Sequence, residues 1–433
     1  MTAMKVEAQP SLDALVDREI ASLVEAYKTL HAAPELSRQE EKTSAFLAKE
    51  LRSAGYAVTE RVGKYDRAGG TGYGVVGVLK NGEGPTVLVR TDLDALPVEE
   101  KTGLPYASRV RTKNDAGQEV GVMHACGHDI HIASLIGTAR ALVQLKDRWR
   151  GTLVLVGQPS EEIGAGAGAM LNDGLYTRFP RPDYALALHD NAELEAGKVG
   201  YCPGYALASV TSVDVTVRGV GGHGSKPEMT KDPVVVAAQV VLALQTIVSR
   251  EVSPLDPAVV TVGSIHGGTK HNIIPDEVKL QITVRAYKEE VRRKILASIE
   301  RISRGVALAA GVPDSLAPVV DASREFTPAT YNDPELTRRL TAVFEKALGR
   351  EKVTPWAPIM AGEDFGRYRL EGDQIPICLF WLGAVDPAKV AEGKRTGAPL
   401  PYLHSSAFAP LPEPTIRTGV KAMTSAVLEL MKR

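Results

Sequence analysis

The hydrophobic pattern of the chain changes at about residue 205 and changes back after about residue 318. On either side of this middle stretch, short continuous apolar runs predict strands that are buried on both faces of a sheet. Residues 212–218, inside the middle stretch, alternate apolar and polar side chains, which predicts a strand with one exposed face. Two domains are therefore expected. The continuous runs are residues 86–90, 151–157, 184–188 and 378–383.

Helices are predicted where apolar residues recur at helical spacing and where helix-end signals occur. Ser37 and Glu40 have the spacing of a capping box, which predicts that a helix begins there. Pro233 fits the first turn of another helix. The predicted helices span residues 12–30, 37–54, 132–144, 232–250, 289–310, 333–349 and 413–431.

The middle stretch has its own order of elements, β-α-β-β-α, with a last strand expected near residues 316–326. This order predicts a small two-layer α+β domain built on an antiparallel sheet. The predicted organisation is an α/β domain made of residues 1–204 and 319–433, with residues 205–318 inserted between its two parts.

Length and composition narrow the classes of partner. A chain of 433 residues is too long for one core, and its net charge of −1 without a basic cluster argues against nucleic acid or an anionic membrane as partner. No apolar run is expected to approach the roughly 20 residues of a spanning helix, and the N-terminus lacks the apolar core of a signal peptide. Three cysteines make no disulfide framework. A cytoplasmic location is expected, or export if a leader has been removed.

Residues that can bind metal follow several of the buried strands, at the edge where sites of open α/β sheets gather. A thiol at a helix start favours the thiolate, and a thiolate with imidazoles suits Zn, Mn, Co or Ni. A buried thiol, turn aspartates or a solvated acidic turn would explain each position alone, but together they predict a metal site. Two adjacent glutamates at a strand end should point apart, so that one binds metal and the other moves a proton. The residues are Asp92, Asp94, Cys126, His128, Glu161, Glu162 and His189.

Competing motifs are weak. Residues 72–77 and 219–224 both match G-x-G-x-x-G, but neither opens a helix directly, as a dinucleotide-binding turn requires. The sequence contains no G-x-S-x-G elbow, no Walker A loop and no H-E-x-x-H motif. His31 precedes a turn, where a histidine is more often structural than a ligand.

Seven motifs together resemble one family, the dinuclear metallo-amidohydrolases that include hippurate hydrolases, bacterial N-acyl-amino-acid aminoacylases and plant auxin-conjugate hydrolases. The resemblance covers nearly the whole chain, with the motifs in the right order. They are residues 90–97 (RTDLDALP), 123–129 (MHACGHD), 158–162 (QPSEE), 221–224 (GGHG), 272–276 (NIIPD), 362–365 (GEDF) and 403–405 (LHS).

The resemblance implies two divalent transition-metal ions (Zn, Mn, Co or Ni) and a role for each matching residue. Cys126 would bridge the ions, Glu161 would be the general acid and base, and Asp92 would hold a ligand in its geometry. The implied fold is a mixed-sheet metal-hydrolase domain with an inserted ferredoxin-like lid, which in the family often also forms a dimer. The implied metal ligands are Cys126, His128, Glu162, His189 and His404, and the implied substrate-binding lid residues are His223, Asn272 and Arg285.

The activity that the resemblance implies is hydrolysis of the amide bond of N-acyl amino acids. His223 would stabilise the oxyanion, and Arg285 with Asn272 would hold the substrate carboxylate. A di- or carboxypeptidase of the same mechanism, or a catalytically silent metal-binding relative, stays open. The expected assembly is a homodimer or a higher homo-oligomer. The sequence departs from the family pattern at Asp190, which follows His189, and at His271 and Thr91.

Overall fold

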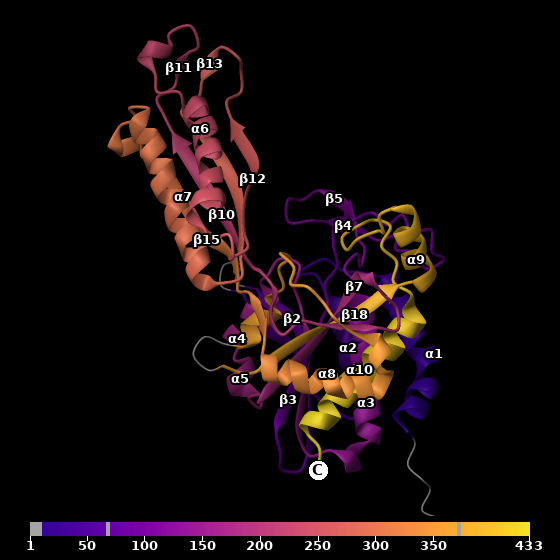
Figure 1. Cartoon of the computed structure of the whole chain (residues 1–433). Coiled ribbons are helices and arrows are strands. Elements are labelled where there is room, and N and C mark those ends of the chain that lie inside the picture. Colours follow the sequence, from indigo (N-terminus) through magenta and orange to yellow (C-terminus); the bar gives the residue numbers. More distant parts are fainter. Residues whose placement is uncertain (1–10, 66–69, 370–373) are drawn as a thin grey trace, which may run out of the picture. The chain divides into compact units, whose positions relative to one another are not determined.

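The computed structural model describes residues 11–65, 70–369 and 374–433 (Figure 1). These residues form two compact units, each with a hydrophobic core of its own. The first unit comprises the described residues up to Gly204, Tyr331–Ala357 and the residues from Arg367 onwards. The second comprises Tyr205–Thr330 and Pro358–Gly366.

The first unit is built on an eight-stranded mixed sheet with the order β1-β2-β6-β3-β7-β18-β8-β17. Its centre is parallel, because β3 pairs in parallel with β6 and β7, and β7 pairs in parallel with β18. The central strands are buried along nearly their whole length, as the continuous apolar runs predicted. The strands are β1 (Ala57–Lys64), β2 (Thr71–Asn81), β3 (Thr86–Asp92), β6 (Gly151–Gln158), β7 (Tyr184–Glu195), β8 (Val199–Tyr201), β17 (Val353–Pro355) and β18 (Ile377–Val385).

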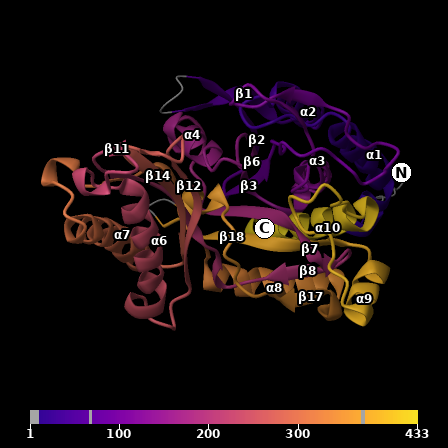
Figure 2. The same cartoon turned by 90° about the horizontal axis from the view of Figure 1, so that it is seen from above.

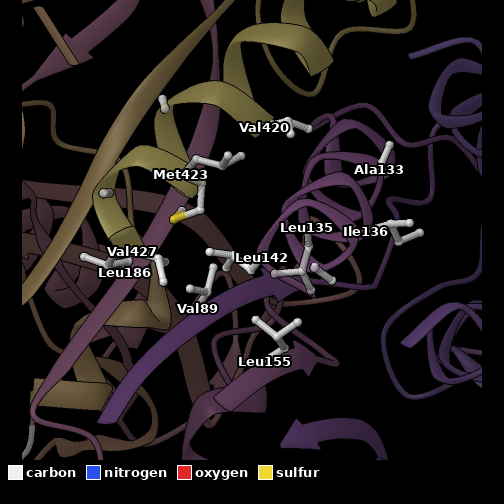
Figure 3. Close-up of a cluster of buried hydrophobic side chains, with 14 of the residues drawn as sticks. Val89, Ala133, Leu135, Ile136, Leu142, Leu155, Leu186, Val420, Met423 and Val427 are labelled. Carbon is white, nitrogen blue, oxygen red and sulfur yellow. The ribbon is translucent and has the colours of Figure 1, made fainter. Parts of the chain in front are cut away.

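Helices pack against this sheet and complete its core. Figure 3 shows Leu135 and Leu142 of α3 meeting Met423 and Val427 of α10 beside Val89 of β3. All five side chains are buried, so α3 and α10 pack together against the central strands of the sheet. The helices are α1 (Leu12–His31), α2 (Glu41–Ser53), α3 (His128–Gln144), α4 (Gly166–Asn172), α5 (Leu175–Arg178), α8 (Pro334–Leu348), α9 (Pro387–Thr396) and α10 (Pro412–Leu430).

The second unit is a four-stranded antiparallel sheet with the order β12-β14-β10-β15. Helices α6 (Pro233–Thr246) and α7 (Glu289–Ala309) lie side by side against it (Figure 2). Chain order and strand order together are those of a ferredoxin-like fold, so the predicted fold class is confirmed. The strands are β10 (Ser209–Arg218), β12 (Ala258–Gly267), β14 (Glu277–Ala286) and β15 (Val319–Thr327); the short ones of the chain are β4 (Arg111–Lys113), β5 (Glu119–Gly121), β9 (Gly204–Leu207), β11 (Gly222–His223), β13 (Ile273–Ile274) and β16 (Thr330–Asn332).

Two boundaries differ from the sequence-based expectation. The second unit does not stop at residue 318, because β15 is hydrogen-bonded to β10 and completes the sheet. The predicted capping box is wrong, because α2 begins at Glu41 and its first-turn amide of Thr43 donates to the carboxylate of Glu35, 2.8 Å away. Ser37 and Glu40 are thereby left to make other contacts.

The expectation that no apolar run approaches the length of a spanning helix is also wrong for one stretch. Pro233–Glu251 is α6 followed by a π-helical turn, and an 18-residue window of it has a mean hydropathy of 1.6, with 33% of that window buried. Val236 and Leu244 on its inner face belong to the core of the second unit, whereas Val235 and Leu242 are exposed. A core helix of a soluble domain passes the same length and hydropathy test.

Candidate metal centre and substrate-binding residues

The candidate metal ligands of the first unit lie at one edge of its sheet. Asp92 is the last residue of β3, Glu161 and Glu162 follow β6, and His128 is the first residue of α3. His189 lies inside β7, one strand residue beyond the predicted end, but the pairing of β7 with β3 stops at Ala187. The parallel register therefore brings these segments together where their strands end.

Cys126 lies in the tight turn that leads into α3. The turn needs a glycine at the next position, because Gly127 has a left-handed φ of 78° and a Cβ there would lie 2.2 Å from a carboxylate oxygen of Asp190. Cys126 is buried, and its Sγ lies 3.5 Å from Nε2 of His189. The helix start thus presents the thiol to an imidazole.

Two of the candidate histidines are held by backbone carbonyls. Nδ1 of His128 donates to the carbonyl of Asp94 at 2.8 Å, and Nδ1 of His189 donates to the carbonyl of Asp190 at 2.8 Å. Each bond fixes the tautomer and leaves Nε2 as the nitrogen that can bind a metal.

Five residues offer two overlapping groups of ligand atoms. Ligand atoms of Cys126, His128 and His189 lie within 4.8 Å of one another, and so do those of Cys126, Glu162 and His404. Cys126 belongs to both groups, which is the arrangement that a bridging thiolate requires. Among the described residues, Nε2 of His128 and Oε1 of Glu162 are buried without a hydrogen-bond partner, although they lie 3.7 Å apart. A divalent cation between them would satisfy both atoms, so the donor set fits a dinuclear transition-metal site.

The electrostatics of this cluster favour added positive charge. Burial together with the nearby Asp94 and Asp92 outweighs the opposing effect of His128 and raises the pKa of Glu162 to about 8. Burial lowers the pKa of His128, but the same acids outweigh it and raise the value to about 10. His404 is exposed, and its pKa is lowered by partial desolvation and by His128 and His189, which favours the neutral form that binds metals.

Asp92 is fully buried, and each of its two carboxylate oxygens accepts a hydrogen bond. Its Oδ1 accepts from Nδ1 of His131 at 2.7 Å, and its Oδ2 accepts from Arg90 at 2.7 Å and lies 3.6 Å from Nε2 of His128. Both nitrogens of His131 are used, because its Nε2 accepts the backbone N–H of Asp190 at 2.9 Å. His131 is thus a support rather than a ligand. Sequence reasoning missed it, although its position three residues after His128 on one helix face was a signal.

Glu161 and Glu162 both face the cluster, which corrects the expectation that adjacent glutamates point apart. Ligand atoms of both lie within 4.8 Å of a nitrogen of His128. The reason is that the chain turns here instead of continuing as a strand. Ser160 has a φ of 54°, and the amide of Gly164 donates to the carbonyl of Glu161 at 2.7 Å. Side chains of a turn do not alternate as those of a strand do.

The last predicted ligand, His404, is held in an uncommon backbone conformation. Its φ is 66°, and its N–H donates to the carbonyl of Ala125 at 2.8 Å. This bond ties the C-terminal loop to the turn that carries Cys126. Its Nε2 lies 3.4 Å from Oε2 of Glu162. A non-glycine residue in the left-handed region costs free energy and is found most often where a function requires it.

In the second unit, His223 and Asn272 lie together. His223 is on β11, which pairs with β13, and the amide of Gly224 donates to the carbonyl of Asn272 at 2.9 Å. His223 is exposed, and its Nδ1 accepts from the amide of Ser225 at 3.1 Å. His271 is exposed beside them.

Arg285 lies at the other end of the same unit. Arg285 of β14 pairs with Val210 of β10, whereas Glu277, at the start of β14, pairs with Arg218 next to the β11–β13 end. These eight strand positions correspond to roughly 26 Å. Within a single chain, Arg285 and Asn272 are therefore too far apart to hold one carboxylate together.

The guanidinium of Arg285 lies close to Gly362. Its Nε donates to Oγ1 of Thr283 at 3.1 Å, and burial lowers its pKa. A Cβ built on Gly362 would lie 3.3 Å from a guanidinium nitrogen and 2.3 Å from a methyl carbon of Val210. The glycine of the motif at residues 362–365 thus gives the guanidinium room.

Comparison with known proteins places these features in a family. Residues 88–411 match the family model described as peptidase family M20/M25/M40. The chain is 37% identical to an N-acetyl-L-cysteine deacetylase of Bacillus subtilis (strain 168), over 84% of this chain and 81% of that protein. It is 38% identical to a hippurate hydrolase of Campylobacter jejuni, over 78% and 82% of the two chains. It is 33% identical to thermostable carboxypeptidase 1 of Saccharolobus solfataricus, over 94% of each.

A solved structure agrees with this assignment. The fold matches that of a dinuclear metal-binding peptidase of the M20 family from Bacillus subtilis with a TM-score of 0.73 and 26% identity, over 96% of this chain and 99% of that one. Dinuclear metal binding is typical of that family, and in this chain two groups of candidate ligand atoms share Cys126. The chain therefore belongs to peptidase family M20/M25/M40 and is a metal-dependent hydrolase.

Proposed function

We propose that this hydrolase cleaves the amide bond of N-acyl amino acids and releases a carboxylic acid and a free amino acid. The observation that carries the proposal is the pair of ligand groups sharing Cys126, with the carboxylate of Glu161 beside them. Relatives named as an N-acetyl-L-cysteine deacetylase and a hippurate hydrolase support this class of substrate.

The residues of the cluster divide into ligands and a proton carrier. Cys126, His128, Glu162, His189 and His404 would hold two divalent ions, of zinc, manganese, cobalt or nickel, and these ions would lower the pKa of a water molecule and polarise the amide carbonyl.

Glu161 would take the proton from the attacking water and deliver it to the leaving amine. It is 9% exposed, and one of its oxygens lies 4.0 Å from Nε2 of His128, so it is close to the cluster without belonging to the two groups that share Cys126. Asp92 would fix the cluster through His131.

Arg285 would bind the carboxylate of the amino-acid half, because a guanidinium stays charged and can bind a carboxylate through two bonds. His223 and Asn272 lie at the opposite end of the second unit, so they would serve the site of a partner chain in a homodimer. Exposed apolar side chains on α6, among them Val235 and Leu242, support an interface on this unit.

A carboxypeptidase is the second candidate, favoured by the similarity to thermostable carboxypeptidase 1 over nearly the whole of both chains. Hydrolysis of a peptide bond next to a C-terminal carboxylate would need the same residues. Turnover of N-acetyl amino acids and hippurate compared with dipeptides and N-blocked dipeptides separates the two. Preference for the peptides would replace the first proposal by the second.

Substitution of the adjacent glutamates tests the division of roles. Glu161→Gln should retain two metal ions per chain and lower kcat by at least about 10²-fold, because the proton carrier is lost. Glu162→Gln should instead lower the metal content measured by elemental analysis. Near-normal turnover of Glu161→Gln would exclude Glu161 as the proton carrier.

A mixing experiment tests the homodimer. His223→Ala and Glu161→Gln chains, each of low activity, should regain activity when subunits exchange, because one site of each mixed dimer would be intact. No recovery after proven exchange would mean that each chain forms its site alone.

A further inference from the structure

Residues 32–40 connect α1 to α2. They include none of the proposed metal ligands and not the proton carrier, yet they make buried contacts with the turn that carries Glu161 and Glu162. Its Glu40 is buried, and one carboxylate oxygen accepts the amide N–H of Ser160 at 2.8 Å and that of Arg38 at 2.9 Å. Glu40 and Ser160 are 120 positions apart in the chain. A buried carboxylate costs free energy, so its retention calls for a role.

Ser160 begins the turn that carries Glu161 and Glu162. It has a left-handed φ of 54°, and its carbonyl accepts the amides of Ala165 and Gly166, each at 3.1 Å. The N–H of Ser160 has Glu40 as acceptor, and the Ser160 hydroxyl lies 3.1 Å from the same oxygen. The carbonyl of Ser160 is thus used within the turn, whereas its N–H is held by Glu40 from outside the turn.

A second contact of the same connection reaches the other end of this turn. The hydroxyl of Ser37 donates to Oδ2 of Asp94 at 2.6 Å, and the same oxygen accepts the amide of Glu162 at 3.0 Å. The carbonyl of Asp94 also accepts from Nδ1 of His128. The connection thus fixes the backbone on both sides of Glu161.

We propose that Glu40 is a positioning residue, which holds residues 160–162 so that Glu161 and Glu162 face the metal cluster. The inference rests on the proposed function for its kinetic test, but not for its metal-binding test. This role needs an accepting oxygen and no charge, because one oxygen of Glu40 accepts the N–H of Ser160, the N–H of Arg38 and the Ser160 hydroxyl, while its second oxygen has no hydrogen-bond partner among the residues that the structure describes. Burial and the nearby Asp94 raise the pKa of Glu40 to about 8, which agrees with this use.

The test compares Glu40→Ala with Glu40→Gln. Glutamine keeps an accepting oxygen for Ser160 and Arg38. Alanine removes the acceptor of the Ser160 amide and leaves the Arg38 amide with the Ser160 hydroxyl, 3.1 Å away, as its acceptor. Glu40→Ala should lower kcat about 10- to 100-fold with KM nearly unchanged, and should weaken binding of the more weakly held cobalt(II) ion by a factor in the same range. Glu40→Gln should stay close to wild type in both measurements.

Kinetics are measured with hippurate or the N-acetyl amino acid that the wild type hydrolyses best, and metal affinity by titrating metal-free protein with cobalt(II) chloride. Glu41→Ala is the matched control, because Glu41 is the next residue, is exposed and pairs with Arg61 on the surface. It should behave as wild type. Circular dichroism establishes that each variant is folded.

Two outcomes would overturn the proposal: a folded Glu40→Ala with wild-type kcat and cobalt affinity, or Glu40→Gln impaired as strongly as Glu40→Ala. If Glu40→Ala does not fold, Glu40→Asp decides, because its carboxylate is one methylene too short to reach Ser160. Wild-type behaviour of Glu40→Asp would then refute the role. A wild type that hydrolyses none of the substrates would refute the proposed function alone, and the cobalt titration would still test Glu40.

Discussion

His31 should stay protonated well above neutral pH and should stabilise the first unit through that charge. Its imidazole is buried at the end of α1, with Nδ1 2.7 Å from Oδ2 of Asp129 on α3 and Nε2 3.1 Å from Oε1 of Glu100. The rings of Tyr27 and Tyr106 cover it. Burial lowers the pKa of His31, but the two carboxylates outweigh burial and raise the value to about 10.

The size of the effect follows from the two pKa values. A histidine with an unfolded pKa of about 6.5 and a folded pKa of about 10 contributes about 5 kcal/mol to the free energy of unfolding. The folded state binds the proton more tightly, so this contribution is complete below about pH 6.5 and declines as the pH rises towards 10. Between pH 7 and pH 9 the loss should be about 2.5 kcal/mol.

Tryptophan fluorescence during urea unfolding measures this loss in the right unit, because Trp149, Trp356 and Trp381, the three tryptophans, all lie in the first unit. The difference in unfolding free energy between wild type and His31→Gln should shrink by about 2.5 kcal/mol from pH 7 to pH 9. NMR of the histidine Cε1–H signals should show the His31 resonance unchanged up to pH 8. A His31 pKa below about 8, or a difference independent of pH, would refute the reasoning.

Two further predictions concern the metal and the substrate carboxylate. Cys126→Ala should lose metal and activity together by elemental analysis and assay, whereas Cys202→Ala should lose neither; retained metal in Cys126→Ala would exclude the bridging role. Gly362→Ala places a methyl group against Val210 and Arg285, and should raise KM about tenfold or more for substrates with a free carboxylate, since a charged hydrogen bond is disturbed. Equal losses for the corresponding amides would show that Arg285 does not bind the carboxylate.

The architecture was predictable where the signal is local in sequence. Strands β3 and β6 are covered on both faces and therefore have continuous apolar runs, while β10 has one polar face and alternates. The start of α2 was not predictable from the Ser37–Glu40 spacing. The carboxylate of Glu35 reaches the first-turn amides after a turn of the chain, and this competition depends on tertiary structure.

The site likewise has some features that a local sequence signal predicts and others that depend on tertiary structure. Cys126 and His128 are two positions apart at a helix start, so their chemistry is visible in the sequence. The contact between Glu40 and Ser160 joins segments 120 positions apart and has no local signal. The distance between Arg285 and the β11–β13 end follows from the antiparallel pairing of β14 with β10. The residues around position 285 carry no signal of that pairing.

The acids at this edge of the sheet connect metal binding with folding. Asp92, Asp94 and Glu162 are buried within a few ångströms of one imidazole, and Asp190 is buried beside them. Neither carboxylate oxygen of Asp190 has a hydrogen-bond partner in the described part of the chain, although one of them lies 3.8 Å from Nε2 of His131. Burial and the other acids raise the pKa of Asp190 well above its usual range, as they raise that of Glu162. So many carboxylates can be buried together only if protons or cations accompany them. Metal binding would replace protons at this edge, so metal affinity, proton release and the stability of the first unit should be linked through the same residues.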